Sequence, residues 1–189
     1  METESKQVAI LVEDFYQELE VWYPLLRLRE AGIETFTVGP QGGATYKSKL
    51  GYPVKADRGV GDVSPTELDA VVIPGGWAPD YLRRHPSCVN LVHEMNVLGK
   101  LIASICHGGW LLCSAGILRN RRATSFFAIK DDMVNAGARW VDEPVVVDGN
   151  LITSRIPEDL PDFCRAILHK LGVTAAEAAS LERQAALRR

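Results

Sequence analysis

The chain is 189 residues long, with 47% hydrophobic residues, 24% charged residues and a formal net charge of −3. These proportions are typical of a globular protein, and the length is sufficient to bury a substantial core. Acidic and basic residues are interspersed, which argues against a nucleic-acid surface or binding to an anionic membrane. The first residues, METESKQVAILV, combine acidic side chains with a short apolar run. Because this pattern matches neither a signal peptide nor a spanning helix, we expect a cytoplasmic protein.

The first part of the chain predicts two strands, a helix and a hairpin. The unbroken apolar run at residues 8–12 is typical of a strand buried on both faces of a parallel sheet. A helix is predicted over residues 19–31, with Gly32 as its stop signal. Residues 33–39 alternate like a second strand, and the glycine-rich residues 42–59 indicate an irregular hairpin. The apolar face of the helix is predicted to consist of Leu19, Trp22, Leu25 and Leu26.

The remainder of the chain alternates strands with helices. Buried strands are predicted at residues 68–76, which end in a Pro-Gly-Gly loop, and at residues 101–105. A hairpin on an Asp-Gly-Asn turn is predicted at residues 144–154. The predicted helices cover residues 85–100, 108–115, 129–137 and 160–172.

Strands that alternate with helices in this way predict an α/β fold, with a mostly parallel sheet and helices on both faces. The sequence shows no internal repeat and no linker, so we expect residues 1–189 to form a single domain. The tail, residues 172–189, is rich in strong helix formers and is expected to dock as a helix or to fray.

The stretch IASICHGGWLLCSAGIL, residues 102–118, contains the clearest chemical signal. Cys106 and His107 stand where an apolar strand gives way to two glycines and a helix. Ligands of parallel sheets bind beyond the carboxyl ends of the strands, and the G-x-S-x-G elbow places a serine at the same kind of turn. At a helix start, free N–H groups and the helix dipole favour a thiolate and can hold an oxyanion. The sequence therefore predicts an exposed nucleophile at Cys106 with a lowered pKa.

The other three cysteines have a simpler interpretation. Cys88, Cys113 and Cys164 lie in apolar or helical settings, where a free cysteine is usually a small buried hydrophobic residue. No C-x-x-C pair is present, so reduced thiols are expected rather than disulfides.

Several motifs together resemble the ThiJ/PfpI superfamily, and within it the intracellular protease I branch. The stretch SICHG is followed by LLCSAGIL and then by IKDDMVNAGARWVDEPVVVDGNLITSRIPEDL. Upstream, ELEVWYPLLRLREAG, LGYPVKAD and VVIPGGWAPDYLR resemble the same branch, so the resemblance covers residues 8–171. It implies a flavodoxin-like three-layer sandwich with a nucleophile elbow, of the class I glutamine amidotransferase-like type. The superfamily also includes the parkinsonism-associated deglycase.

The resemblance implies a role for Cys106 and for Glu20. Cys106 matches the family nucleophile, and Glu20 matches a glutamate at the start of the first helix that approaches the sulfur. A protonated Glu20 would donate a hydrogen bond to the thiolate, since burial beside an anion raises the pKa of a carboxyl group. Ready oxidation of Cys106 to a sulfinic acid would follow. From the residues alone, the alternative is that Glu20 is a solvated acid in the first turn of a helix, where the helix dipole favours it.

The resemblance also implies partners for the nucleophile. His107 matches the histidine of the branch's Cys-His pair, whose acid comes from a neighbouring subunit; Asp80 occupies that position here, where a glutamate is common. The residues alone make Asp80 a helix N-terminal residue. A homo-oligomer follows from this borrowed acid: at least a dimer, with a hexamer as a further possibility. The backbone N–H groups expected to hold an oxyanion belong to Gly75, Gly76 and Gly108.

Two positions depart from the family pattern. Phe126 stands where many relatives carry a tyrosine, and Gln17 stands where a second acidic residue is frequent. Both changes remove a polar or ionisable group from the rim of the site. We therefore expect a substrate preference that differs from that of relatives, with proteolysis less favoured than small-molecule chemistry.

No cofactor is expected. His85 and His93 do not have the spacing of a zinc-binding H-E-x-x-H motif, and the chain has neither a Walker motif nor a G-x-G-x-x-G motif. The four tryptophans are too scattered to form a stacking platform, so core or interface packing is expected for them.

These observations lead to two functional hypotheses. The first is a stress-response enzyme, a cysteine-dependent hydrolase that acts on reactive carbonyls as a deglycase or glyoxalase, or on peptides. The alternative is a redox sensor or chaperone that signals through oxidation of Cys106 without turnover. A sensor does not need a proton carrier, so the presence of His107 favours the enzyme.

Overall fold

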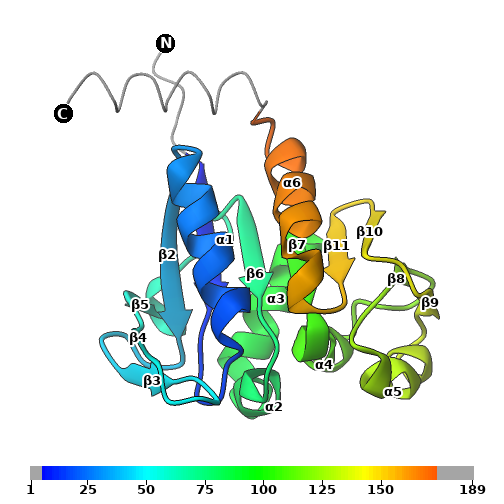
Figure 1. Cartoon of the computed structure of the whole chain (residues 1–189), viewed down its shortest axis with the longest axis horizontal. Coiled ribbons are helices and arrows are strands. Elements are labelled where there is room, and N and C mark those ends of the chain that lie inside the picture. Colours follow the sequence, from blue (N-terminus) through cyan, green and yellow to red (C-terminus); the bar gives the residue numbers. More distant parts are fainter. Residues whose placement is uncertain (1–5, 174–189) are drawn as a thin grey trace.

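The computed structural model describes residues 6–173 (Figure 1). The strands are β1 (Gln7–Leu11), β2 (Glu34–Gly39), β3 (Thr45–Lys47), β4 (Pro53–Lys55), β5 (Arg58–Gly59), β6 (Ala70–Ile73), β7 (Leu101–Ile105), β8 (Arg122–Ala123), β9 (Arg139–Trp140), β10 (Val145–Asp148) and β11 (Leu151–Ser154). The α-helices are α1 (Glu18–Glu30), α2 (Ala78–Leu82), α3 (Pro86–Val97), α4 (Gly109–Ser114), α5 (Lys130–Asn135) and α6 (Leu160–Lys170). Short 3₁₀ turns cover Val60–Asp62, Cys106–Gly108, Phe127–Ile129 and Pro157–Asp159.

Seven strands form the central sheet, in the order β10-β11-β7-β6-β1-β2-β5. All neighbours are parallel except β10 and β11, which pair as the predicted antiparallel hairpin. The middle strands are mostly apolar because both faces are covered; Val8 to Val12 are completely buried. The predicted α/β fold with a mostly parallel sheet is therefore confirmed.

Helices cover both faces of the sheet (Figure 1). Helices α1 and α6 lie together on one face, where their apolar side chains pack on β1, β7 and β11. Helices α3, α4 and α5 belong to the core on the opposite face. Each core contains side chains from the central strands β1, β6 and β7 and from β11. The parallel pairing of β1 with β6 and of β6 with β7 places the carboxyl ends of these three strands beside one another.

The predicted apolar face of α1 is wrong. Of its four predicted residues only Leu25 is buried, whereas Leu19 and Leu26 are 55% and 59% exposed. The helix instead faces the sheet with its other stripe, which consists of Glu20, Val21, Pro24, Leu25 and Leu28. A glutamate and a proline are not expected on the core face of a helix, so the sequence predicts that the apolar side chains of the neighbouring stripe are buried instead.

Short elements account for the other differences. The segment after β6 contains the short helix α2, with Asp80 in its first turn, which agrees with the interpretation of Asp80 from the residues alone. Strands β5, β8 and β9 have two residues each and no detectable period. The predicted hairpin within residues 42–59 is present as the antiparallel pair β3 and β4. The predicted tail largely coincides with residues 174–189, which lie outside the described residues. Among helices of the described part, none is long and apolar enough to cross a membrane.

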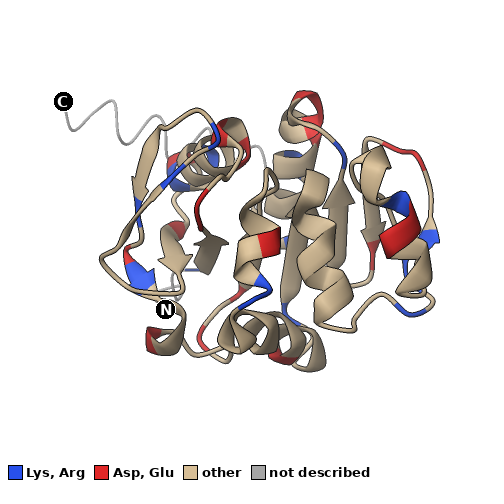
Figure 2. Ribbon diagram, turned by 90° about the horizontal axis from the view of Figure 1, so that it is seen from below, with Lys and Arg blue, Asp and Glu red and all other residues tan. Residues whose placement is uncertain are grey.

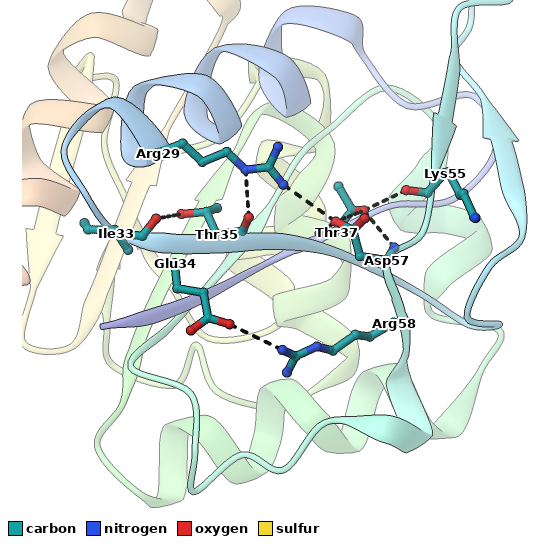
Figure 3. Close-up of polar contacts among 8 residues, drawn as sticks. All are labelled: Arg29, Ile33, Glu34, Thr35, Thr37, Lys55, Asp57 and Arg58. Carbon is teal, nitrogen blue, oxygen red and sulfur yellow. Dashed lines mark hydrogen bonds and ion pairs between the residues drawn. The ribbon is translucent and has the colours of Figure 1, made fainter. Parts of the chain in front are cut away.

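Polar contacts fix the base of the β3–β4 hairpin to β2 (Figure 3). The Thr37 N–H donates to Asp57 Oδ2 over 2.9 Å, and Thr37 Oγ1 donates to the Lys55 carbonyl oxygen over 2.7 Å. Arg29 of α1 donates through Nε to the Thr35 carbonyl oxygen over 2.9 Å and lies 3.7 Å from Asp57 Oδ2. The hairpin is thus held by both α1 and β2, which positions its tip beside the start of α1.

The parallel strands β1, β6 and β7 all end at the lower edge of the sheet in Figure 1. Figure 2 views the molecule from this end, where acidic and basic residues are scattered and no region carries one sign alone. Here β7 gives way to the Cys106–Gly108 turn and then to α4. The approach of this turn to β6 requires Gly108, since a Cβ there would lie 2.6 Å from the Ile73 carbonyl oxygen.

This close contact predicts a stability effect. Gly108→Ala is expected to lower the free energy of unfolding by about 1–3 kcal/mol, because the added methyl group must displace backbone at the end of β6. Urea denaturation followed by circular dichroism measures the change. The matched control is Gly61→Ala, where a Cβ meets nothing within 4 Å. Equal stability of the two variants would contradict the packing described for the turn.

Candidate active site

Cys106 lies at a backbone elbow. Its φ is +60°, a left-handed conformation that a residue with a side chain rarely adopts and that costs about 1–3 kcal/mol. The surrounding structure holds it there: the chain enters from the buried strand β7, and the Phe126 N–H donates to the Cys106 carbonyl oxygen over 3.2 Å. The strained turn predicted from the sequence is present at this residue.

The sulfur belongs to a small cavity rather than to the open surface. Cys106 is only 8% exposed, so the predicted exposed nucleophile is wrong in this respect. The cavity has a volume of about 220 Å³, and its wall includes residues from separate parts of the chain: Gln17, Glu20, Lys49, Trp77, His107 and Phe126. A small substrate can therefore reach the sulfur from a pocket with mixed aromatic and polar walls.

Glu20 is completely buried beside the nucleophile. The Gly75 N–H donates to Glu20 Oε2 over 2.6 Å, while Oε1 has no hydrogen-bond partner among the described residues. Burial raises the pKa of Glu20 to about 7, although the Gly75 N–H and Cys106 act to lower it. The interpretation of Glu20 as a solvated first-turn acid is wrong, because its helix turns this residue toward the core.

Only glycine at position 75 allows Glu20 and Cys106 to meet. A Cβ at this position would lie 2.7 Å from both Glu20 Oε2 and Cys106 Cβ, and 2.8 Å from the backbone nitrogen of His107. The Gly75 N–H is occupied by Glu20, so it is not free to hold a substrate oxygen as the family resemblance implied. Gly76, at φ +71°, is the loop glycine whose N–H acts on the sulfur.

His107 contacts the nucleophile despite being its neighbour in the chain. Its Nδ1 lies 3.3 Å from Cys106 Sγ, and its ring stacks on Phe126 with centroids 4.9 Å apart. Trp77 and Trp110 flank the ring at 5.6 and 5.0 Å. Burial, and then the charge of Lys49, lower the pKa of His107, which favours the neutral imidazole. A neutral ring in this position can accept a proton from the sulfur.

The pKa of Cys106 does not follow the sequence argument. Burial, and next the negative charge of Glu20, raise the pKa of this thiol to about 12. The N–H groups of His107 and Gly76 act in the predicted direction but are outweighed. The sequence predicts these N–H groups, but it does not reveal that the Cys106 thiol is buried. Protonation of Glu20 removes the repulsion, so the charge on the sulfur depends on the proton of its neighbour.

Asp80 is engaged within its own helix. Its carboxylate accepts from Arg83 over 2.7 Å and also pairs with Arg84, and these contacts lower the pKa of Asp80. Among residues 6–173, its hydrogen bonds and ion pairs join it to Arg83 and Arg84 and not to His107. Its predicted role as the acid from a neighbouring subunit concerns an assembly that a single chain does not contain.

Sequence reasoning missed four residues of the cavity: Lys49, Trp77, Ile156 and Pro157. Lys49 comes from the tip of the β3–β4 hairpin, and Trp77 follows the Pro-Gly-Gly loop and is 54% exposed rather than packed in a core. Neither residue belongs to a pattern that marks a site. For Trp77, its position directly after Gly75 and Gly76 was the one available signal.

The raised pKa of Glu20 predicts a pH-dependent stability. The folded state binds the Glu20 proton more tightly than the unfolded chain, whose carboxyl has a pKa of about 4.5. Stability contributed by this group is complete below pH 4.5 and is lost as the pH rises to about 7, in total about 3 kcal/mol. A Cys106→Ser background removes the thiol that titrates beside the carboxyl, and the groups common to both proteins cancel in the comparison. Urea denaturation at pH 5 and pH 8 should therefore show this loss for Cys106→Ser relative to Cys106→Ser/Glu20→Gln. Parallel pH profiles for the two proteins would contradict the raised pKa.

Comparisons with known proteins identify the family of this chain. The family model described as DJ-1/PfpI family matches residues 6–170. The chain is 44% identical over 165 residues to "Deglycase PH1704" of Pyrococcus horikoshii, which covers 87% of this chain and 99% of the relative. It is 42% identical over 170 residues to "Protein/nucleic acid deglycase 2" of Escherichia coli, which covers 89% of this chain and 99% of the relative.

A solved structure shows the same fold. The chain matches Drosophila melanogaster DJ-1beta with a TM-score of 0.87 and 28% sequence identity, over 96% of this chain and 97% of that one. The extent of these matches leaves one conclusion: the chain belongs to the DJ-1/PfpI family.

Proposed function

We propose that this protein is a cysteine-dependent hydrolase of the deglycase type, which removes adducts of reactive carbonyls such as methylglyoxal from amino groups. Relatives with 42–44% identity over most of the chain are named deglycases. The observation that carries the proposal is the 3.3 Å contact between Cys106 Sγ and His107 Nδ1 in a cavity of substrate size. This pair supplies a nucleophile and a base, which a redox sensor would not require.

The proposed reaction begins with attack of Cys106 on the amide form of the adduct, into which the initial hemiaminal isomerises through an enediol, so that a carbonyl carbon is bonded to the amine nitrogen. The new S–C bond forms as the thiol proton moves to His107 Nδ1, and the carbonyl electron pair moves onto oxygen. The N–H groups that act on the sulfur, those of Gly76 and His107, lie where they would stabilise the oxyanion. The C–N bond then breaks, and the amine leaves with the proton from His107. Water cleaves the S–C bond, which restores the thiol and releases a carboxylic acid.

Glu20 controls the charge at the nucleophile in this proposal. Its Oε1 is buried without a partner among the described residues, and buried polar groups of this kind are costly unless they are hydrogen-bonded. When protonated, this oxygen would donate to the sulfur, which offers it the missing partner. The same proton removes the negative charge that opposes thiolate formation.

We also propose that the protein is a homo-oligomer. No acidic side chain of residues 6–173 is hydrogen-bonded to His107, and the resemblance assigns this role to Asp80 of a second copy. An apolar groove of about 640 Å³ between α1 and the β3–β4 hairpin supports self-association. Its wall includes the exposed side chains of Leu19, Leu26, Leu50 and Tyr52. A groove of this kind is typical of surfaces that a partner covers.

A cytoplasmic location is proposed as well. The four cysteines are free thiols, and thiols persist in a reducing compartment.

The proposal predicts which side chains are needed for turnover. Cys106→Ser should abolish release of amino groups from methylglyoxal-treated amino acids, and His107→Ala should lower kcat by about 10²–10⁴-fold, because the thiol loses its base. Cys113→Ser is the control, since this cysteine contacts Met133 and does not line the cavity. The enzyme hypothesis fails if wild type releases amines no faster than Cys106→Ser.

Self-association is tested by the mass in solution. Light scattering after gel filtration should give a multiple of the 20.8 kDa chain mass for wild type. Leu26→Glu should shift the protein toward the monomer, because the charge enters the apolar groove. Val97→Glu on α3 is the control, since Val97 is 70% exposed and outside the groove. A wild-type protein that is monomeric and fully active would remove Asp80 from the mechanism.

A further inference from the structure

Lys49 brings a positive charge to the cavity of the nucleophile. It lies at the tip of the β3–β4 hairpin, and its side chain lines the same cavity as Cys106. The backbone N–H of Lys49 donates to the Tyr16 carbonyl oxygen over 3.1 Å, and this hydrogen bond connects the hairpin tip to the segment that precedes α1. The base of the hairpin is anchored to β2 by Thr37 and Asp57. The lysine is therefore positioned by structure on both sides of the tip.

The charge of Lys49 is not neutralised by an ion pair. Among the ion pairs within residues 6–173, none includes Lys49. Glu20, the other charged residue of the cavity wall, is completely buried and already accepts the Gly75 N–H. The lysine charge acts on the carboxylate of Glu18, which accepts the Leu50 N–H over 3.0 Å and does not line the cavity. It also acts on Glu20 and His107, which places it within electrostatic reach of the reacting atoms.

Gln17 adds a neutral donor to the same wall. Its Oε1 accepts the Glu20 N–H over 3.0 Å, where it caps α1, so the rest of the amide, its NH₂ group, provides donors. A carboxylate at this position would oppose an anionic ligand, whereas the amide does not. Lys49 and Gln17 thus provide an ammonium and an amide donor in one small cavity.

We infer that Lys49 is a specificity-determining residue that selects substrates carrying a carboxylate close to the carbon that Cys106 attacks. This inference rests on the proposed function and names its substrate class: adducts of small carboxylates, such as free amino acids, rather than adducts of neutral amides. The volume of about 220 Å³ corresponds to about seven water molecules, which suits a ligand of this size.

Two alkylating reagents test the effect of the Lys49 charge on Cys106 without enzymatic turnover. Iodoacetate and iodoacetamide transfer the same carbon to sulfur and release the same iodide, but only iodoacetate carries a carboxylate. The ratio of their rates at Cys106, measured by mass spectrometry of its peptide, should fall at least 5-fold in Lys49→Met and stay unchanged in Lys49→Arg. Lys55→Met on the same hairpin is the matched control, because Lys55 is exposed and does not line the cavity.

An unchanged ratio in Lys49→Met, or an equal fall in Lys55→Met, overturns the inference. A second measurement separates it from the proposed function. Lys49→Met should lower kcat/KM about 10-fold for the methylglyoxal adduct of glycine and less than 2-fold for that of glycinamide. If both adducts are turned over and Lys49→Met affects them equally, the inference that Lys49 selects carboxylates is wrong, while the deglycase proposal is supported. If neither adduct is turned over but the alkylation ratio falls, the anion selection stands and the deglycase proposal fails.

Discussion

The approach of the Glu20 carboxyl to Cys106 beneath Gly75 is the contact on which the site depends. Two ionisable groups share a space from which water is largely excluded, and each makes the charged form of the other costlier. The absence of a side chain at Gly75 is the condition for this contact, since a Cβ there would overlap both groups. The strained backbone of Cys106 and the turn of α1 that buries a glutamate are parts of the same arrangement.

Because of this contact, the charge on the Cys106 sulfur depends on whether Glu20 carries a proton. With Glu20 ionised, the thiol is held in its protonated form; with Glu20 protonated, the repulsion is gone and a donor is available to the sulfur. Because the pKa of Glu20 is raised to about 7, both forms exist near neutral pH. A neutral His107 in contact with the sulfur gives the proton a place to go during attack.

The substrate-facing side of the cavity has a different origin from the chemical centre. The centre is built from the ends of β6 and β7 and the start of α1, which the parallel sheet brings together. The outer wall comes from the hairpin tip with Lys49 and from the aromatic residues Trp77 and Phe126. Such loop-borne walls vary without disturbing the sheet, which is why one nucleophile in one fold can serve different substrates.

The sequence by itself determined the layered α/β fold and the elbow that carries Cys106. Those inferences rest on local signals: buried apolar runs, glycine stops, and a thiol at a strand end. The pairing of Cys106 with His107 came from the family resemblance, because adjacency in the chain does not fix where two side chains point. The tertiary structure decided which face of α1 is buried, because the Gly75 N–H from another segment provides a buried partner for the Glu20 carboxyl. It also decided the pKa of Cys106, since burial is a property of the assembled layers and not of a motif. Lys49 and Trp77 join the cavity through packing of segments that are distant in the chain, and no local pattern records that contact.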